Sequence, residues 1–235
     1  MMKKISAFVL ALVMMLSACA LADQTISVTG QATVQLEPDM VMISLGVTAT
    51  HEEVLLAQEQ VNMAMNQVIE ALTTDMAIPE EDVATSEYRI DEYWEYNSMS
   101  GRSEMIGYNA TAMLSIYVRD IAQAGAVIDA AMKAGANQLR SVEFMSSDDS
   151  AARDQALTLA VQDGMHKAQV IAKAAGLNLP AVPDKITEES AYSYSGVNRT
   201  YAYEDSGTMD TAAATTLQAG LLSITATVGI EYDID

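Results

Sequence analysis

The side chains that could do chemistry in this sequence are few and widely spaced. Histidine occurs twice, at His51 and His166, and neither has a cysteine or a second histidine at the spacing of a metal site. No serine stands in a Gly-x-Ser-x-Gly turn, which would indicate a hydrolase nucleophile. Cys19 is the only cysteine, and it lies in an apolar leader. We therefore expect no catalytic residues, no cofactor, no metal site and a protein that is not an enzyme.

Acidic residues cluster at 80–82, 91–92, 148–149 and 233–235. None of these clusters follows the spacing of a calcium loop. Helix caps and solvated faces explain them, with weak surface binding of calcium as the alternative. The formal net charge is −20, and such a surface repels nucleic acid and anionic lipid. We expect no nucleic-acid partner; a cationic partner is the alternative to simple solubility.

Aromatic side chains gather in two segments that we interpret as loops. Tyrosine and tryptophan are enriched where proteins meet partners. These residues could instead staple the loops to the body of the protein or stack on carbohydrate. The interface candidates are Tyr93, Trp94, Tyr96, Tyr192, Tyr194, Tyr201 and Tyr203.

The N-terminus has the layout of a secretory signal peptide. A basic head precedes the apolar run ISAFVLALVMML (5–16), which is too short to span a bilayer. Two cleavage signals follow. LSAC (16–19) fits a lipoprotein whose first residue is a lipidated Cys19, and Ala-Leu-Ala fits release with Asp23 first. We expect residues 1–22 to be removed as a signal peptide. The alternative is a chain that begins at Cys19, whose lipid would be its only attachment to a membrane.

Hydrophobic periodicity predicts the elements of the remaining chain. Two alternating runs flank Pro38-Asp39 and are typical of a β-hairpin. Thr50 and Glu53 have the spacing of a capping box. A stripe of small residues around Gly164 predicts a helix that packs closely on its neighbour. The expected strands are 26–36, 41–49, 83–90, 106–118, 141–145, 182–188 and 222–232, and the expected helices are 54–72, 120–134 and a long helix from about 150 to 175.

This order predicts an α+β fold. We expect a mixed, mainly antiparallel sheet packed by one short and two longer helices, in the order β-β-α-β-β-α-β-α-β-β. Residues 23–235 form one domain, for which two lobes sharing a sheet are an alternative. Mobile arms are expected near 91–104 and 191–216, where the candidate aromatics lie.

With these elements placed, the chain resembles the SIMPL-domain family over nearly all of residues 26–233. The resemblance lies in the order and spacing of several segments. Two positions depart from the family pattern and put only local packing in question. Relatives often carry asparagine at the position of Ala112, and Gly164-Met165 replaces a more usual Ala-Arg. The matching segments are ISVTGQATVQLEPDMVMISLGV, DVATSEYRI, GYNATAMLSIYVRD, VIDAAMKAGANQLRSVEF, ALTLAVQDGMHKAQVIAKAAG and ITEES.

The resemblance implies an exported bacterial α+β protein in the periplasm, at the cell surface or secreted. Members of the family are described as periplasmic or surface antigens, one with a link to oxidative stress and one forming large ring-like assemblies. The family provides no catalytic residues to transfer. We therefore expect a non-enzymatic envelope or secreted protein that self-assembles as a homo-oligomer through its aromatic arms, with a stress-related role. The alternative is a monomeric binding module for a cell-wall or cationic ligand.

Overall fold

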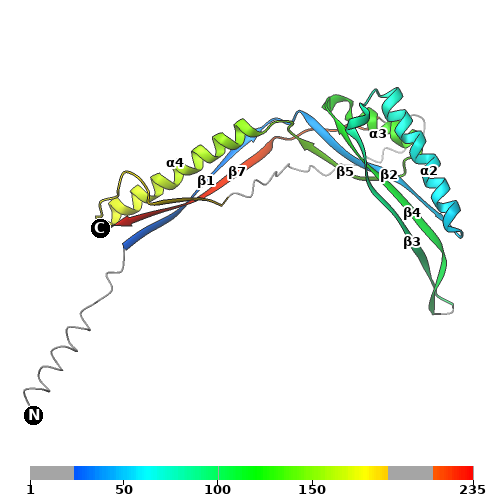
Figure 1. The fold of residues 1–235 in the computed structure, drawn as a ribbon, viewed down its shortest axis with the longest axis horizontal. Coiled ribbons are helices and arrows are strands. Elements are labelled where there is room, and N and C mark those ends of the chain that lie inside the picture. The colour runs from blue at the N-terminus through cyan, green and yellow to red at the C-terminus, as the bar shows by residue number, and fades with distance from the viewer. Residues whose placement is uncertain (1–23, 100, 190–213, 235) are drawn as a thin grey trace, which may run out of the picture. The chain divides into compact units, whose positions relative to one another are not determined.

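A computed structural model describes residues 24–99, 101–189 and 214–234 (Figure 1). The leader with Cys19 and the candidates Tyr192, Tyr194, Tyr201 and Tyr203 lie outside these residues. The α+β class and the predicted order of strands and long helices are confirmed. The strands are β1 (Gln24–Leu36), β2 (Met40–His51), β3 (Val83–Asn97), β4 (Arg102–Val118), β5 (Gln138–Met145), β6 (Lys185–Glu188) and β7 (Leu222–Ile234), and the long helices are α2 (Val54–Glu70), α3 (Ala124–Lys133) and α4 (Ser150–Ala175).

The strands form two sheets, and this corrects the predicted hairpin of residues 26–36 and 41–49. One sheet has the order β1-β7-β6 and the other β3-β4-β2-β5, so β1 and β2 are in different sheets. Between them, Asp39 is held by a distant contact, because its carboxylate accepts hydrogen bonds from the backbone N–H (2.7 Å) and hydroxyl (2.5 Å) of Ser147. Alternation specifies which face of a strand is buried, but it does not specify the neighbouring strand.

The described residues form two compact units. The three-stranded unit comprises residues 24–33, 154–189 and 225–234, and the four-stranded unit comprises residues 34–153 and 214–224. Each has its own layer of helix on sheet.

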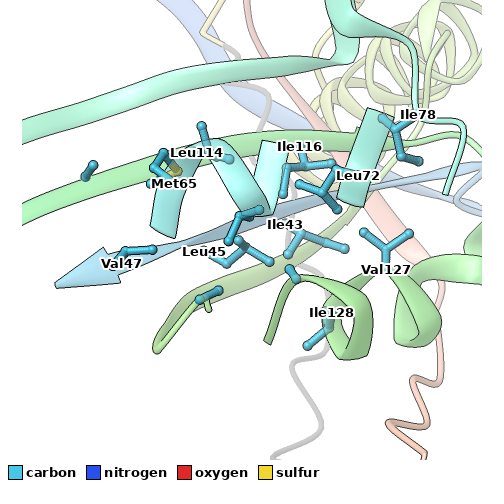
Figure 2. Close-up of a cluster of buried hydrophobic side chains, with 14 of the residues drawn as sticks. Ile43, Leu45, Val47, Met65, Leu72, Ile78, Leu114, Ile116, Val127 and Ile128 are labelled. Atoms are coloured by element: carbon cyan, nitrogen blue, oxygen red, sulfur yellow. The ribbon is translucent and has the colours of Figure 1, made fainter. Parts of the chain in front are cut away.

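The core of the four-stranded unit lies between one face of its sheet and the helices α2 and α3 (Figure 2). Central strands β2 and β4 are antiparallel, and their register places Ile43 opposite Ile116 and Leu45 opposite Leu114. All four of these side chains are at most 1% exposed. The predicted stripe of α2 covers them, and it continues through Leu72 in the π-helical turn Ala71–Asp75. The buried members of this stripe are Ala57, Val61, Met65, Val68 and Leu72.

The predicted capping box at the start of α2 is wrong. The hydroxyl of Thr50 instead donates to Oδ1 of Asn109 in the neighbouring strand (3.3 Å). Glu53 is the N-cap and makes no side-chain cap, while Nδ1 of His51 accepts the backbone N–H of Glu53 (3.0 Å). The hydroxyl of Thr50, which the spacing predicted to cap α2, therefore bonds to the neighbouring strand.

The end of the predicted loop 191–216 is docked on α3. Both the backbone N–H and the hydroxyl of Thr215 donate to the carboxylate of Asp129, at 3.1 and 2.6 Å. A Cβ at Gly125 would lie 2.0 Å from the carbonyl oxygen of Thr215, so only glycine allows this approach. Leu217 then packs against the core. Residues 214–217 therefore belong to the body of the four-stranded unit.

In the three-stranded unit, α4 lies along one face of the sheet (Figure 1). Its buried stripe has a spacing of four residues, and the backbones meet at Gly164 and Gly30. A Cβ at Gly30 would lie 2.1 Å from the carbonyl oxygen of Ala160 and 2.6 Å from the nitrogen of Gly164. The predicted close packing is confirmed, but the predicted members Ile171 and Ala175 are exposed. The buried residues of the stripe are Ala152, Ala156, Ala160, Gly164, Ala168 and Ala172.

Side chains of α4 also cover the outer edge of β1. Lys167 donates to the carbonyl oxygen of Thr29 (3.0 Å), and the carboxylate of Asp163 accepts the backbone N–H of Gln31 (2.9 Å). Asp163 and Lys167 are themselves paired at 2.6 Å. Unpaired edge groups are a template for pairing with another chain. This ion pair therefore closes the middle of the β1 edge.

The covered edge predicts a pH-dependent contribution to stability from Asp163. The hydrogen bonds from Lys167 and then from the Gln31 backbone lower the pKa of Asp163. A lowered pKa stabilises the fold above the unfolded-state value, and this contribution is lost as the pH falls through the folded-state value. We expect Asp163→Asn to lower the melting temperature modestly at neutral pH, because the pair is solvent-screened. The difference should begin to shrink as the pH falls below about 4, the ordinary pKa of an aspartate, and vanish below the lowered pKa of the folded protein.

Thermal melts followed by circular dichroism measure this difference. Asp154→Asn is the matched control, because Asp154 is an exposed aspartate of the same helix and has no ion pair among the described residues. A difference between Asp163→Asn and the wild type that stays constant down to acid pH would contradict the assignment.

Candidate functional site

The β3–β4 hairpin extends beyond the rest of its sheet. The last pair between β2 and β4 is His51 with Tyr108, whereas β3 and β4 remain paired as far as Asn97 with Arg102. From Tyr93 and Gly107 outward the hairpin is therefore a two-stranded ribbon, and we call residues 91–106, which include the last residues of β3 still beside the sheet, the hairpin tip (Figure 1). The segment predicted as a connection between strands 83–90 and 106–118 instead continues both strands.

The root of the hairpin tip is held by close backbone contact. A Cβ at Gly107 would lie 2.6 Å from the carbonyl oxygen of His51, so glycine is required where β4 passes the turn before α2. The register shifts next to Gly107, because Tyr93 pairs with Gly107 and Trp94 with Met105. Ile106 is the extra residue of this bulge. Bulges increase the local twist and redirect the side chains beyond them.

The hairpin tip exposes the three candidate aromatics that the structure describes. Tyr93, Trp94 and Tyr96 are 43%, 54% and 66% exposed. Successive side chains of a strand point to opposite faces, so Tyr93 lies on one face of the ribbon and Trp94 and Tyr96 on the other. A tyrosine of the same strand nearer the core does bond to the body of the protein. The hydroxyl of Tyr88 donates to Oδ1 of Asn62 in α2 (3.0 Å).

Sequence reasoning missed further apolar side chains at the same place. Met99 is 96% exposed, Met105 39% and Ile106 40%. Their signal was present in the sequence, because all three lie in or beside the segment that carries the aromatics. The hairpin tip therefore exposes apolar and aromatic side chains on both of its faces.

Carboxylates accompany these apolar groups. The tip contains Asp91, Glu92, Glu95 and Glu104 against the single base Arg102. The carboxylate of Asp91 is in an ion pair with Arg89 of the same strand (2.5 Å). The indole N–H of Trp94 donates to Oε2 of Glu92 (3.2 Å). This hydrogen bond fixes the ring beside an acid. The tip therefore combines aromatic rings with negative charge.

The sheet face opposite α2 and α3 carries a paired charge network. Arg140 on β5 reaches Glu87 on β3 (2.5 Å), although these are the two outer strands of the sheet. The ion pair crosses the two central strands at Gly46 on β2, which has no side chain. Gly46 pairs with Met113 on β4, and Met113 pairs with Glu87 on β3. The hydrogen bond from Arg140 and then the charges of Arg140 and Arg89 lower the pKa of Glu87 against desolvation. This ion pair links the two outer strands of the sheet, and its exposed position limits its contribution to stability.

The described part of the chain shows no histidine or carboxylate metal site. No group of three or more histidine, cysteine, aspartate or glutamate side chains in it could hold a metal ion. His51 is the last residue of β2 and His166 lies on the exposed side of α4. Among these residues there is also no helix long and apolar enough to cross a membrane.

The chain is thus an α+β protein with exposed aromatic side chains at the end of one hairpin. The profile of the SIMPL family, described as a protein of unknown function (DUF541), matches residues 26–232, and the chain belongs to this family. This confirms the resemblance seen in the sequence.

Curated relatives are 26–28% identical to this chain over the aligned residues. An uncharacterized protein YggE from Edwardsiella ictaluri is 27% identical over 80% of this chain and 77% of its own length. The YggE of Escherichia coli K12 is 26% identical over 61% of this chain and 57% of its own. The 26 kDa periplasmic immunogenic protein of Brucella melitensis is 28% identical over 67% of this chain and 64% of its own. The match thus spans less than two thirds of the Escherichia and Brucella proteins.

Proposed function

We propose that this protein is an exported, non-enzymatic protein of the bacterial envelope that self-assembles through its hairpin tip. Export is supported by the basic and apolar leader and by the relative named as periplasmic. The compartment is the periplasm, the cell surface or the medium. The cleavage site decides between release at Asp23 and a lipid tether at Cys19.

The observation that carries the proposal is the exposure of Trp94 and Tyr96 on a ribbon fixed at its root. Large apolar and aromatic side chains that are exposed together on one element are typical of interaction sites. Tryptophan and tyrosine are the residues that most often dominate interface energies, each contributing about 2 kcal/mol or more at a hot spot. A ribbon held at Gly107 and His51 loses little conformational freedom when it docks.

Removal of the tip aromatics tests this function. We expect Trp94→Ser with Tyr96→Ser to raise the concentration at which the oligomer dissociates by about 30-fold or more, the equivalent of one hot spot. Replacement of residues 94–106 by Asn-Gly, which joins the paired residues Tyr93 and Gly107, should give a monomer. Light scattering across a dilution series measures both.

Tyr88→Phe is the matched control. It removes a hydroxyl that bonds within the protein and leaves the hairpin tip intact, so assembly should persist. Retention of the wild-type oligomer after replacement of residues 94–106 would contradict the role of the tip.

The acidic character of the tip favours a second candidate, a monomeric binding module for a cell-wall or cationic ligand. Four acids surround the exposed rings with one base, and rings beside carboxylates suit a cationic group with apolar parts. Saturable binding to envelope fractions that weakens with salt and with Trp94→Ala would support this function. Flat titrations would count against it.

A further inference from the structure

Three methionines share the face of the four-stranded sheet that lies opposite α2 and α3. Ile43 of β2 and Phe144 of β5 face the core beneath these helices. Successive side chains of a strand point to opposite faces. Met42, next to Ile43, and Met145, next to Phe144, therefore point to the other face, and Met40 shares it because it lies two residues before Met42. We call Met40, Met42 and Met145 the methionine cluster.

The strand register brings the methionine cluster together. Met40 is directly opposite Met145 in the antiparallel pair of β2 and β5, which places their Cβ atoms about 5 Å apart. Met42 follows about 7 Å further along β2 on the same face. The sulfur of methionine lies beyond Cβ on an unbranched, flexible side chain. All three sulfurs can therefore reach one small ion.

Hydrogen bonds hold the backbone on both sides of the cluster. The N–H of Asp39, next to Met40, donates to the carbonyl oxygen of Met145 (3.1 Å). The carboxylate of Asp39 accepts the backbone N–H (2.7 Å) and the hydroxyl (2.5 Å) of Ser147, which follows Met145 by two residues. The two strands are thus fixed where the methionines project. A ligand set on fixed strands loses less conformational freedom when an ion binds.

Burial and composition suit a soft metal ion. Met40 is 9% exposed, and Met42 and Met145 are half-buried, so the cluster is largely shielded from water but open to a small ion. After residue 22 the sequence contains no cysteine, so thioethers are its only sulfur ligands. Thioethers select Cu(I), whereas carboxylates and carbonyls suit magnesium, calcium and manganese. Thioethers also have no proton to lose before they bind a metal ion.

Two neighbours on the same face favour a cation. Met42 is paired with Tyr117 of β4 on one side and with Glu143 of β5 on the other. Tyrosine rings attract cations to their faces. Glu143 is exposed and makes no ion pair within the described residues. Its charge is therefore available to balance that of a monovalent ion.

Other methionines of the described residues do not form such a group. Met63 and Met65 are close in sequence, but on α2 they point to different sides, one 54% exposed and the other in the core. Met113 lies over Gly46, because a Cβ added there would be 2.6 Å from its sulfur. Gly46 is four residues from Met42, or about 13 Å along the strand. Met113 is therefore separate from the methionine cluster.

We propose that the methionine cluster binds one Cu(I) ion. The sulfurs of Met40, Met42 and Met145 are the ligands, and Tyr117 and Glu143 favour the cation beside them. The site lies within one unit of a single copy. It therefore does not depend on assembly through the hairpin tip.

Metal titration of the purified mature chain tests this site. The probes are Cu(I), kept reduced without oxygen, and Ag(I), a soft monovalent ion that is stable in air. Native mass spectrometry should show one ion bound per subunit, and X-ray absorption of the Cu(I) form should show a first shell dominated by sulfur. Met42→Leu with Met145→Leu should lower the affinity by more than the roughly 10–100-fold that loss of an outer-shell partner costs.

Met63→Leu is the matched control, because it removes an exposed thioether outside the cluster. Its affinity for both ions should equal that of the wild type. Leucine and methionine are similar in volume, so without metal all three proteins should melt alike. A bound ion stabilises the folded state, so Ag(I) should raise the melting temperature of the wild type and of Met63→Leu but not that of the double variant.

The outcomes are distinct from those of the assembly experiments, which are done without metal. Absence of saturable one-to-one binding would overturn the site. Equal affinities of the wild type and the double variant would overturn it too, because the ion then binds elsewhere. A loss in Met63→Leu as large as that in the double variant, or a first shell without sulfur, would also contradict it. Each of these results leaves self-assembly through the hairpin tip untouched.

Discussion

Gly30→Ala is expected to lower the free energy of unfolding by about 3 kcal/mol or more, the upper range for overpacking. The new methyl group would lie 2.1 Å from the carbonyl oxygen of Ala160 and 2.6 Å from the nitrogen of Gly164. Both atoms belong to the backbone of α4, so no side chain can rotate away. The helix must rise from the sheet, and its stripe of small residues then loses contact along its length.

Urea denaturation of the mature chain measures this change, and Gly229→Ala is the matched control. Gly229 lies in β7 of the same sheet, where a Cβ would meet only the carboxylate end of the exposed Glu189, at 2.8 Å. That side chain can move, so we expect a change below about 1 kcal/mol. Equal effects of the two substitutions would contradict the close approach of α4 to β1.

Leu72→Ala is expected to cost about 2–5 kcal/mol, the range for truncation of a buried leucine. Leu72 is fully buried in the π-helical turn after α2 and packs in the core of the four-stranded unit (Figure 2). Its removal leaves a cavity between helix and sheet that close-packed neighbours fill only in part. The free energy of unfolding from urea denaturation is the appropriate measurement.

The control substitution makes the same chemical change on the adjoining helix. Leu55 lies in the first turn of α2 and is 72% exposed, so Leu55→Ala should change stability by no more than about 0.5 kcal/mol. A loss at Leu55 as large as that at Leu72 would show that the register of α2 on the sheet is wrong.

Periodicity in the sequence was sufficient for the elements and their buried faces. The stripe of α2 from Ala57 to Leu72 and the small-residue stripe of α4 follow directly from spacing. Ile171 and Ala175 were misplaced because the stripe keeps a strict interval of four and reaches Ala172. Near the end of the helix, apolar residues stand at both Ile171 and Ala172, and nothing local in the sequence shows which of the two is buried.

Strand pairing could not be predicted in the same way. β1 and β2 are adjacent in sequence and separated by Pro38-Asp39, yet β1 pairs with β7, nearly two hundred residues further along the chain, as in the hydrogen bond between the hydroxyls of Thr33 and Thr225 (2.9 Å). Pairing energy depends on side chains from both strands and on the layer that covers them. A local turn signal carries neither kind of information.

The candidate site was partly visible in the sequence. The aromatic composition of residues 91–104 indicated a contact surface, but the exposed fractions and the two-stranded geometry needed the structure.

Self-assembly through the hairpin tip is the central claim, and native mass spectrometry of the full-length gene product purified from a bacterial host tests it most directly. The subunit mass also distinguishes a chain that begins at Asp23 from one that begins at a lipidated Cys19. We predict a discrete oligomer whose mass is a whole multiple of the subunit mass. A protein that remains monomeric at high concentration would contradict the account.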